Sequence, residues 1–183
     1  MSKYPAYPSV TQVFGHYLAN VPRDLLEYAG DRGTRVHSFC TKHAIGAFIP
    51  GGGVDSDCMG YFLSFQTWYH DYVKNTLWVE REFIDTDYGF VGHPDMGVVL
   101  KEGPSAIIDL KTPRKLERIW AGQLAAYSHL TRKNGQECDR VGTLRLSPHG
   151  GPALMKWYED SPRDLAAFIN LLTGYKYFFH DAA

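Results

Sequence analysis

Cysteine is scarce in this sequence, and long apolar runs are missing from it. The three cysteines, Cys40, Cys58 and Cys138, are odd in number, lie far apart and form no CxxC pair. Buried free thiols are therefore expected, and a disulfide framework, a zinc site or an iron–sulfur cluster is not. No stretch approaches the roughly 18 uninterrupted apolar residues of a membrane span, and residues 1–10 lack the profile of a signal peptide. We expect a cytoplasmic protein without a membrane partner.

A surplus of positive charge is missing as well. The chain carries 19 lysines and arginines against 20 aspartates and glutamates, a net charge of −1. Because nucleic-acid-binding proteins usually show a basic surplus, any argument for such a partner has to come from local clusters. Hydrophobic residues, by contrast, make up 44% of the 183 residues. This length and proportion predict one compact domain spanning residues 1–183.

Hydrophobic periodicity and turn residues divide the chain into helices and strands. The expected helices are residues 10–18, 23–29, 33–48, 58–73 and 117–132, with a closing helix that starts near residue 161. The expected strands are residues 76–84, 89–100, 105–111, 140–146 and 153–158. Helices, then a three-strand meander, a crossover helix and further strands predict an α/β fold: a mixed central β-sheet flanked by helices, with a helical N-terminal part.

An acid and an amine stand close together in one apolar strand. Asp109 and Lys111 are two residues apart, so their side chains project from the same face of that strand. Burying them there costs several kcal/mol unless they are paired or bind an ion. The preceding strand supplies Asp95, and a short connection would fold it back beside Asp109. Two carboxylates could then share one cation.

Hard oxygen ligands of this kind suit Mg²⁺ or Mn²⁺, and the backbone carbonyl of Leu110 could be another ligand. Hydrolysis of a phosphodiester requires an activated water and neutralisation of the charge that grows on the phosphate oxygens. Asp95 and Asp109 would hold the ion, and Lys111 would orient or activate the water. The trio therefore predicts a metal-dependent centre that cuts phosphodiester bonds.

Four motifs follow one another along the chain: Arg32-Gly33-x-x-x-His37, Gly92-x-x-Asp95, Asp109-x-Lys111-Thr112 and Gln123-x-x-x-Tyr127. Together they resemble the RecB-like exonuclease branch of the PD-(D/E)XK nuclease superfamily. That branch includes phage-type, CRISPR-associated and mitochondrial single-strand exonucleases. The resemblance implies a restriction-endonuclease-like core. Several iron–sulfur members hold the domain with four cysteines, which the three scattered cysteines of this chain cannot reproduce.

The resemblance also implies roles for individual residues. His37 would join the two aspartates as a metal ligand. Gln123 and Tyr127, which share one helix face at i and i+4, would line the groove and contact the nucleic-acid backbone. Arg32 and Thr112, from the same motifs, would bind substrate too. The implied partner is DNA, single- or double-stranded, and the implied activity is that of an exonuclease in replication, repair or phage recombination, as a monomer or a ring-forming homo-oligomer.

Each of these residues also has a purely structural interpretation. Asp109 and Lys111 could be an ion pair at the end of a strand, and Asp95 could be a turn residue after proline. His37 could be a packing or surface residue, and the Gln-x-x-x-Tyr pair could make ordinary core contacts. The roles of three residues near the trio stay open: Glu80, Glu82 and His93.

Two other functions compete with a DNA nuclease. His70 and Asp71 could belong to an HD-type metal phosphohydrolase, but that fold is all-helical and the strands expected between residues 76 and 111 argue against it. The chain could also be a nucleic-acid-binding module that kept the nuclease fold and lost its activity. The intact set of Asp95, Asp109 and Lys111 argues against that alternative.

Overall fold

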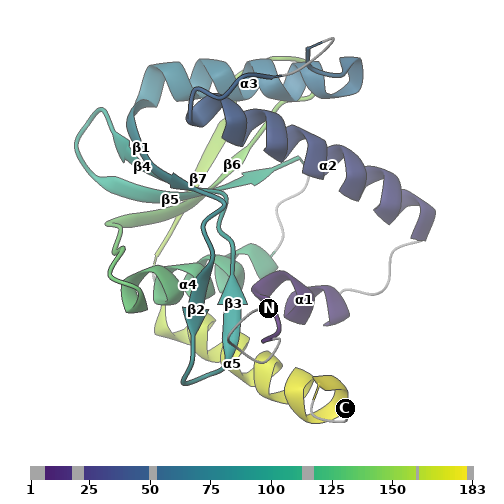
Figure 1. Cartoon of the computed structure of the whole chain (residues 1–183), viewed down its shortest axis with the longest axis vertical. Coiled ribbons are helices and arrows are strands. Elements are labelled where there is room, and N and C mark those ends of the chain that lie inside the picture. The colour runs from purple at the N-terminus through teal and green to yellow at the C-terminus, as the bar shows by residue number, and fades with distance from the viewer. Residues whose placement is uncertain (1–6, 18–22, 50–52, 113–117, 160, 181–183) are drawn as a thin grey trace.

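A five-stranded mixed sheet runs through the middle of the molecule, with helices on both faces (Figure 1), as expected for the α/β class. The computed structural model describes residues 7–17, 23–49, 53–112, 118–159 and 161–180, and only the backbone of residues 23–29 and 180. The helices in these ranges are α1 (Val10–Tyr17), α2 (Arg23–Ala44), α3 (Ser56–Tyr72), α4 (Ile119–Lys133), α5 (Pro162–Tyr175) and the π-helical η1 (Lys176–His180). The strands are β1 (Val73–Val79), β2 (Phe83–Asp85), β3 (Phe90–Gly92), β4 (Met96–Leu100), β5 (Ser105–Lys111), β6 (Arg140–Arg145) and β7 (Leu154–Tyr158).

The strands of the main sheet lie in the order β1-β4-β5-β6-β7. Neighbouring strands are antiparallel except for β5 and β6, which are parallel and are connected through α4. A parallel pair requires a crossover of this kind, because a tight turn can join only antiparallel strands. β2 and β3 form a separate hairpin that lies on the side of α4 (Figure 1).

Two hydrophobic cores fill the space on the two faces of the sheet. The first core joins the sheet to α2 and α3, and the second joins it to α1, α4, α5 and the β2–β3 hairpin. β5 contributes to both because its side chains alternate: Ile108 and Leu110 belong to the first core and Ile107 to the second. Each fully buried side chain of this size contributes about 1.5–3 kcal/mol. β5 is therefore anchored on both faces.

The helices expected at residues 23–29 and 33–48 form a single helix, α2. Gly30 and Gly33 lie inside it, at a cost of roughly 1 kcal/mol each relative to alanine. The cost is offset by packing, because Val36, Cys40 and Ala44 recur at helical spacing and are buried against the first core. Separate helices were the wrong prediction here because glycine weakens a helix without ending it.

Two of the expected strands are each split in two. The strand expected at 76–84 ends at Val79, because Glu80 adopts a left-handed backbone conformation (φ 43°), and β2 starts only at Phe83. The strand expected at 89–100 is interrupted near Pro94, which has no N–H to give to a ladder, so β3 and β4 are distinct. The interruption allows β3 to leave the main sheet and pair with β2.

The three cysteines are free thiols, as expected: Cys40 and Cys58 are buried and Cys138 is partly buried. Burial raises the pKa of all three thiols, and that of Cys58 reaches about 11. None of the helices within the described ranges has the length and apolar character that crossing a bilayer requires.

Candidate active site

Asp95 and Asp109 lie next to each other on adjacent strands. Asp95 directly precedes β4, and the antiparallel register places Met96 opposite Ile108, one residue before Asp109. Both aspartates are buried, with 8% and 3% of their surface exposed. Two buried carboxylates at such close quarters are unfavourable unless positive charge lies near them. The structure supplies that charge from two directions.

Lys111 is the first source of positive charge. Its Nζ lies 2.5 Å from Asp109 Oδ2 and donates a hydrogen bond to Gln123 Oε1 at 3.0 Å. The same ammonium group lies 5.5 Å from the centre of the Trp120 ring. One contact comes from β5 itself and two come from α4, so the lysine is held between the strand and the helix.

Gln123 and Tyr127 face this pair from successive turns of α4. Gln123 Nε2 donates to Asp109 Oδ1 at 3.3 Å and to the Tyr127 hydroxyl at 3.1 Å. The helix can approach so closely because Gly92 has no side chain. A Cβ at that position would lie 3.0 Å from Tyr127 Cε1 and 2.6 Å from Leu130 Cδ1. The glycine of the Gly-x-x-Asp motif therefore serves the packing of α4.

His37 is the second source of positive charge and reaches the site from α2. Its Nδ1 lies 3.1 Å from Asp95 Oδ1, while Asp95 Oδ2 accepts the backbone N–H of Leu110 at 2.6 Å. Asp95 is therefore fixed by a helix on one side and by β5 on the other. In the neutral ring with the proton on Nδ1 toward Asp95, Nε2 is the nitrogen whose lone pair could approach a cation, whereas the protonated ring has no such lone pair.

Burial disfavours negative charge on both aspartates, but their neighbours shift the pKa values of the two carboxyl groups in opposite directions. For Asp95, attraction to His37 and the hydrogen bonds it accepts outweigh burial, and its pKa is lowered. For Asp109, burial together with repulsion from Asp95 outweighs attraction to Lys111, and its pKa is raised. Burial alone would lower the pKa of His37, but the Asp95 carboxylate raises it. Asp109 is thus the acid whose charge is least compensated.

This donor set fits a small hard cation. Asp109 Oδ2 is wholly buried and, within the described residues, has the ion pair with Lys111 but no hydrogen bond. Mg²⁺ uses one or two carboxylates and keeps several waters, so it does not require a tight cage of protein ligands. The potential ligand atoms of His37, Asp95 and Asp109 do not all come within 4.8 Å of one another among the described residues. Asp95 and Asp109 can supply the carboxylates that such an ion uses, and a ligand role for His37 stays a prediction.

Arg32 lies on α2 and Thr112 directly follows β5. The Arg32 guanidinium stands 5.3 Å from the centre of the Tyr61 ring. Thr112 Oγ1 would be 3.7 Å from a Cβ at Gly33, so the end of β5 runs close to the glycine of the Arg-Gly motif. A role for either residue in binding substrate stays a prediction, as does the Leu110 carbonyl as a ligand.

Glu80 is the acidic residue whose place the sequence does not reveal. Its backbone N–H donates to the Asp95 carbonyl at 2.9 Å, and its side chain accepts a 3.4 Å hydrogen bond from Thr41, one helical turn after His37. Glu82 and His93 instead pair with each other on the surface at 3.2 Å. A glutamate at the end of a strand carries no signal for a left-handed turn, so only the fold brings Glu80 beside Asp95.

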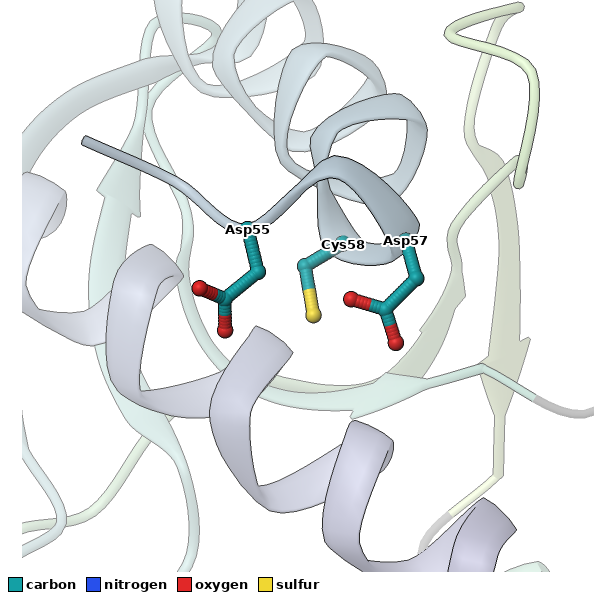
Figure 2. Close-up of side chains that lie close together, drawn as sticks. All are labelled: Asp55, Asp57 and Cys58. Atoms are coloured by element: carbon teal, nitrogen blue, oxygen red, sulfur yellow. The ribbon is translucent and has the colours of Figure 1, made fainter. Parts of the chain in front are cut away.

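A second acidic group lies at the start of α3. Asp55, Asp57 and Cys58 bring possible ligand atoms within 4.8 Å of one another (Figure 2), the one such trio among the described residues. Arg35 neutralises the negative charge of the two aspartates, because its guanidinium contacts Asp55 at 2.7 Å and Asp57 at 2.8 Å. Its Nε also contacts Asp31 at 3.0 Å. Arg35 therefore links α2 to the start of α3 through ion pairs.

No family model and no curated protein matches this sequence. Among solved structures, the chain is similar to LHK-Exo in complex with dAMP, with a TM-score of 0.49 and 12% identity over 92% of this chain and 85% of that one. It is also similar to SSO0001, with a TM-score of 0.40 and 15% identity over 90% and 81% of the two chains. At these values neither likeness bears on function, which rests on the side chains described above.

Proposed function

We propose that this chain is a metal-dependent nuclease that hydrolyses the phosphodiester bonds of DNA. One observation carries the proposal: the fold gathers Asp95, Asp109 and Lys111 at one end of the sheet, with His37 and Gln123 bonded to them. These residues come from four separate motifs and meet as two adjacent groups, His37 with Asp95 and Gln123 with Lys111 and Asp109. The bond from the Leu110 N–H to Asp95 joins the two groups. A chance ion pair at a strand end would not account for the buried second aspartate.

Asp95 and Asp109, with the Leu110 carbonyl, are the groups that would hold a divalent cation. When bound, Mg²⁺ or Mn²⁺ supplies positive charge to the phosphate and lowers the pKa of a water molecule. His37 keeps Asp95 ionised and oriented through the Nδ1 contact. The raised pKa of Asp109 means that its proton, where present, has to leave before this carboxyl can act as a ligand.

Lys111 would act on the phosphate and on the attacking water. Gln123 holds its ammonium group at 3.0 Å, and this fixed positive charge would stabilise the negative charge that develops on the phosphate oxygens. Tyr127 does not act as a base, because burial raises the pKa of its hydroxyl. It acts through Gln123, whose amide nitrogen bonds the phenol oxygen.

The finer parts of the proposal are an exonuclease of replication, repair or phage recombination, DNA as the substrate and one domain for the whole chain. The exonuclease activity and the DNA substrate rest on the four motifs and their resemblance to RecB-like exonucleases, and the single domain rests on the length and hydrophobic content of the chain. The HD-type alternative finds no support in the fold. His70 and Asp71 bond each other at 2.9 Å on the surface at the end of α3, in a protein with a five-stranded sheet.

The test is cleavage of end-labelled single- and double-stranded DNA with Mg²⁺ or Mn²⁺. We expect the parent to cut with at least one of the metals, and Asp109→Ala and Lys111→Ala to lose nearly all activity. Lys101→Ala is the matched control, since Lys101 lies in the turn at the opposite end of β5 and bonds the His70 carbonyl. His70→Ala should also cut normally.

Two outcomes would count against the proposal. If neither metal supports cleavage of any DNA substrate while the folded protein still binds DNA, the chain is the inactive binding module. If Asp109→Ala and Lys111→Ala cut as fast as Lys101→Ala, the nuclease activity comes from elsewhere and this site is not its centre.

A further inference from the structure

A groove of about 610 Å³ lies between α4, α5 and β7 and takes no part in the roles proposed above. Each of the three elements places one basic residue in its lining: Arg118 at the start of α4, Lys156 on β7 and Arg163 on α5. The other described lining residues are one acid, Asp164, and Ala121, Tyr158 and Ala167. The groove therefore carries a surplus of positive charge, although the net charge of the chain is −1.

The three basic side chains are exposed, and none of them makes an ion pair with an acid among the described residues. Arg35 and Lys133, by contrast, each contact two or more aspartates. Asp164 lies in the first turn of α5, where the N–H groups of the helix start stabilise a carboxylate. Unpaired positive charge that gathers in one groove is typical of a surface that binds an anion.

A larger hollow of the protein lacks this surplus. It has a volume of about 740 Å³, and its charged lining consists of two arginines and three acids: Arg132, Arg140, Glu137, Asp139 and Glu159. Arg132 pairs with Glu137 at 3.1 Å, so part of this charge is neutralised within the hollow itself. The positive surplus is thus a property of the groove between α4, α5 and β7, and not of every hollow on the surface.

The groove lies on the same face of the sheet as the candidate active site. Asp109 is paired with Thr143 in the ladder of β5 and β6, and Thr143 is paired with Lys156 in the ladder of β6 and β7. Paired residues of neighbouring strands project from the same face of a sheet. Because neighbouring strands lie about 4.8 Å apart, the backbone of Lys156 is about 10 Å from that of Asp109.

The lining suits phosphate groups better than bases. Guanidinium and ammonium groups donate strong, charge-assisted hydrogen bonds to phosphate oxygens. Bases are usually bound by stacking on aromatic side chains. The groove has one aromatic ring among its described lining residues, that of Tyr158, and the Lys156 ammonium lies 4.7 Å from the centre of this ring. The groove therefore offers charge and little stacking surface.

We infer that this groove binds the sugar–phosphate backbone of DNA beside the point of cleavage and makes no contact with the bases. The inference rests on the proposed nuclease function, which supplies the ligand, and adds a place for DNA outside the site that cuts it. Arg118, Lys156 and Arg163 each neutralise one phosphate. Contacts of this kind position the nucleic acid but carry no information about its sequence.

The test measures DNA binding in the absence of cleavage. A fluorescein-labelled oligothymidylate is titrated in EDTA at several salt concentrations, and fluorescence anisotropy gives the affinity. Arg118→Gln, Lys156→Gln and Arg163→Gln should each weaken binding about 5-fold near 0.1 M salt and lower the slope of log K against log[salt] by about 0.7. The triple variant should lower this slope by about 2. Thermal unfolding checks that every variant is folded.

Lys74→Gln and Arg140→Gln are the matched controls, because each removes the same charge from an exposed side chain outside the groove. Lys74 lies on β1, at the opposite edge of the sheet from β7. Arg140 lies at the end of β6 that is away from Lys111. Both variants should keep the affinity and the salt dependence of the parent, which separates loss of the groove from loss of net charge.

An abasic oligonucleotide of the same length tests for contact with the backbone alone. The variants of the groove should lose affinity for it by the same factors as for oligothymidylate. The inference is overturned if these variants bind as the controls do, if the parent shows no salt-dependent binding, or if the losses appear only with the strand that carries bases.

Cleavage by Asp109→Ala separates this inference from the proposed function. If Asp109→Ala abolishes cleavage and the triple variant binds DNA as the parent does, the nuclease stands and the groove falls. If the triple variant loses its salt dependence as expected but Asp109→Ala cuts normally, the groove stands as a DNA-binding surface and the proposed active site falls.

Discussion

The side-chain oxygen of Gln123 accepts a 3.0 Å hydrogen bond from Lys111 Nζ. The nitrogen of the same amide donates to Asp109 Oδ1, so one residue of α4 contacts both charged groups of β5. An amide can do this only with its oxygen toward the lysine and its nitrogen toward the carboxylate. Gln123 is therefore a positioning residue, since it acts through Lys111 and Asp109.

Gln123→Met should lower kcat about 10-fold or more and leave KM nearly unchanged, because the methionine fills the space but no longer holds the lysine for the transition state. Lost hydrogen bonds in this buried setting should also cost about 1–3 kcal/mol of unfolding free energy. Steady-state cleavage kinetics and urea unfolding measure the two effects. Gln66→Met on α3 is the control, and an unchanged kcat in Gln123→Met would show that Lys111 needs no support.

Asp109→Asn should stabilise the protein in the absence of divalent cations while abolishing cleavage. A carboxyl whose pKa is raised on folding binds its proton more tightly in the folded state, so its contribution to stability is lost as pH rises through the folded pKa. A neutral amide removes this loss and should add about 0.5–2 kcal/mol at pH 7. The gain should vanish below about pH 4, where the acid is protonated in both states.

Urea unfolding at pH 7 and at low pH, with EDTA, measures this effect. Mg²⁺ should raise the stability of the parent by binding to the folded state and should do so much less in Asp109→Asn. Asp71→Asn, at an exposed position on α3, is the control. A variant that is less stable than the parent at pH 7 would mean that Lys111 compensates Asp109 fully.

His37→Ala should weaken Mn²⁺ binding about 10–100-fold, the usual effect of removing a group that orients a metal ligand. The physical reason is the Nδ1 contact at 3.1 Å that holds Asp95. Calorimetric titration with Mn²⁺ measures it. His129→Ala, beyond the active site, serves as the control. A loss far larger than that range would show that His37 is itself a ligand through Nε2.

Asp85 should make the protein sensitive to acid. Burial alone would raise its pKa, but hydrogen bonds from His129 and Lys133 and from two backbone N–H groups lower it to about 2. A carboxyl with a lowered folded pKa contributes stability that is complete above its unfolded pKa, near 4, and is lost as pH falls towards 2. Asp85→Asn should therefore cost roughly 2 kcal/mol at pH 7 and flatten the fall in stability between pH 4 and 2.

Urea unfolding across that pH range measures the effect. Asp87→Asn is the control, because Asp87 pairs with the same Lys133 but its side chain is 78% exposed, and an exposed pair contributes at most about 1 kcal/mol. Equal losses in the two variants would contradict a special role for the buried carboxylate.

Gly92→Ala should destabilise the protein by about 1–3 kcal/mol, since the new methyl group has to displace Leu130 and the Tyr127 ring. Cleavage should fall as well, because Tyr127 supports Gln123. Thermal unfolding and the cleavage assay measure both. Gly30→Ala, where a Cβ meets no described atom, should instead gain up to about 1 kcal/mol. A harmless Gly92→Ala would mean that α4 can move away without consequence.

Parts of the fold follow directly from the sequence. β5 spans the expected residues 105–111, because an apolar run bounded by turn residues has well-marked ends, and strand alternation places Asp109 and Lys111 on one face. α2 was harder to predict, because Gly30 looks like an interruption while the buried stripe that carries the helix through is a tertiary effect. Pro94 is a local signal for a break, but the left-handed turn at Glu80 and the packing of the β2–β3 hairpin against α4 are not visible in any local pattern.

Some features of the candidate site also follow from the sequence, and others depend on tertiary packing. The sequence places Gln123 and Tyr127 on one helix face, but which of them touches Lys111 depends on how α4 crosses β5. His37 was expected as a metal ligand. The contact of its Nδ1 with Asp95 depends on how closely α2 packs beside the start of β4, which the sequence does not show. The roles of these residues in binding and catalysis stay predictions until the variants are made.

The parallel pairing of β5 and β6 through α4 has a consequence for how the centre assembles. Asp95, Asp109, Lys111 and Gln123 all belong to one hairpin and the crossover that follows it, so their contacts close short loops of chain. Short loops close faster than long ones, and this part of the protein should gain structure early in folding. His37 lies on α2, which is much farther from these residues in the sequence. Pulse-labelled hydrogen exchange should therefore show the amides of β5 protected before those of α2.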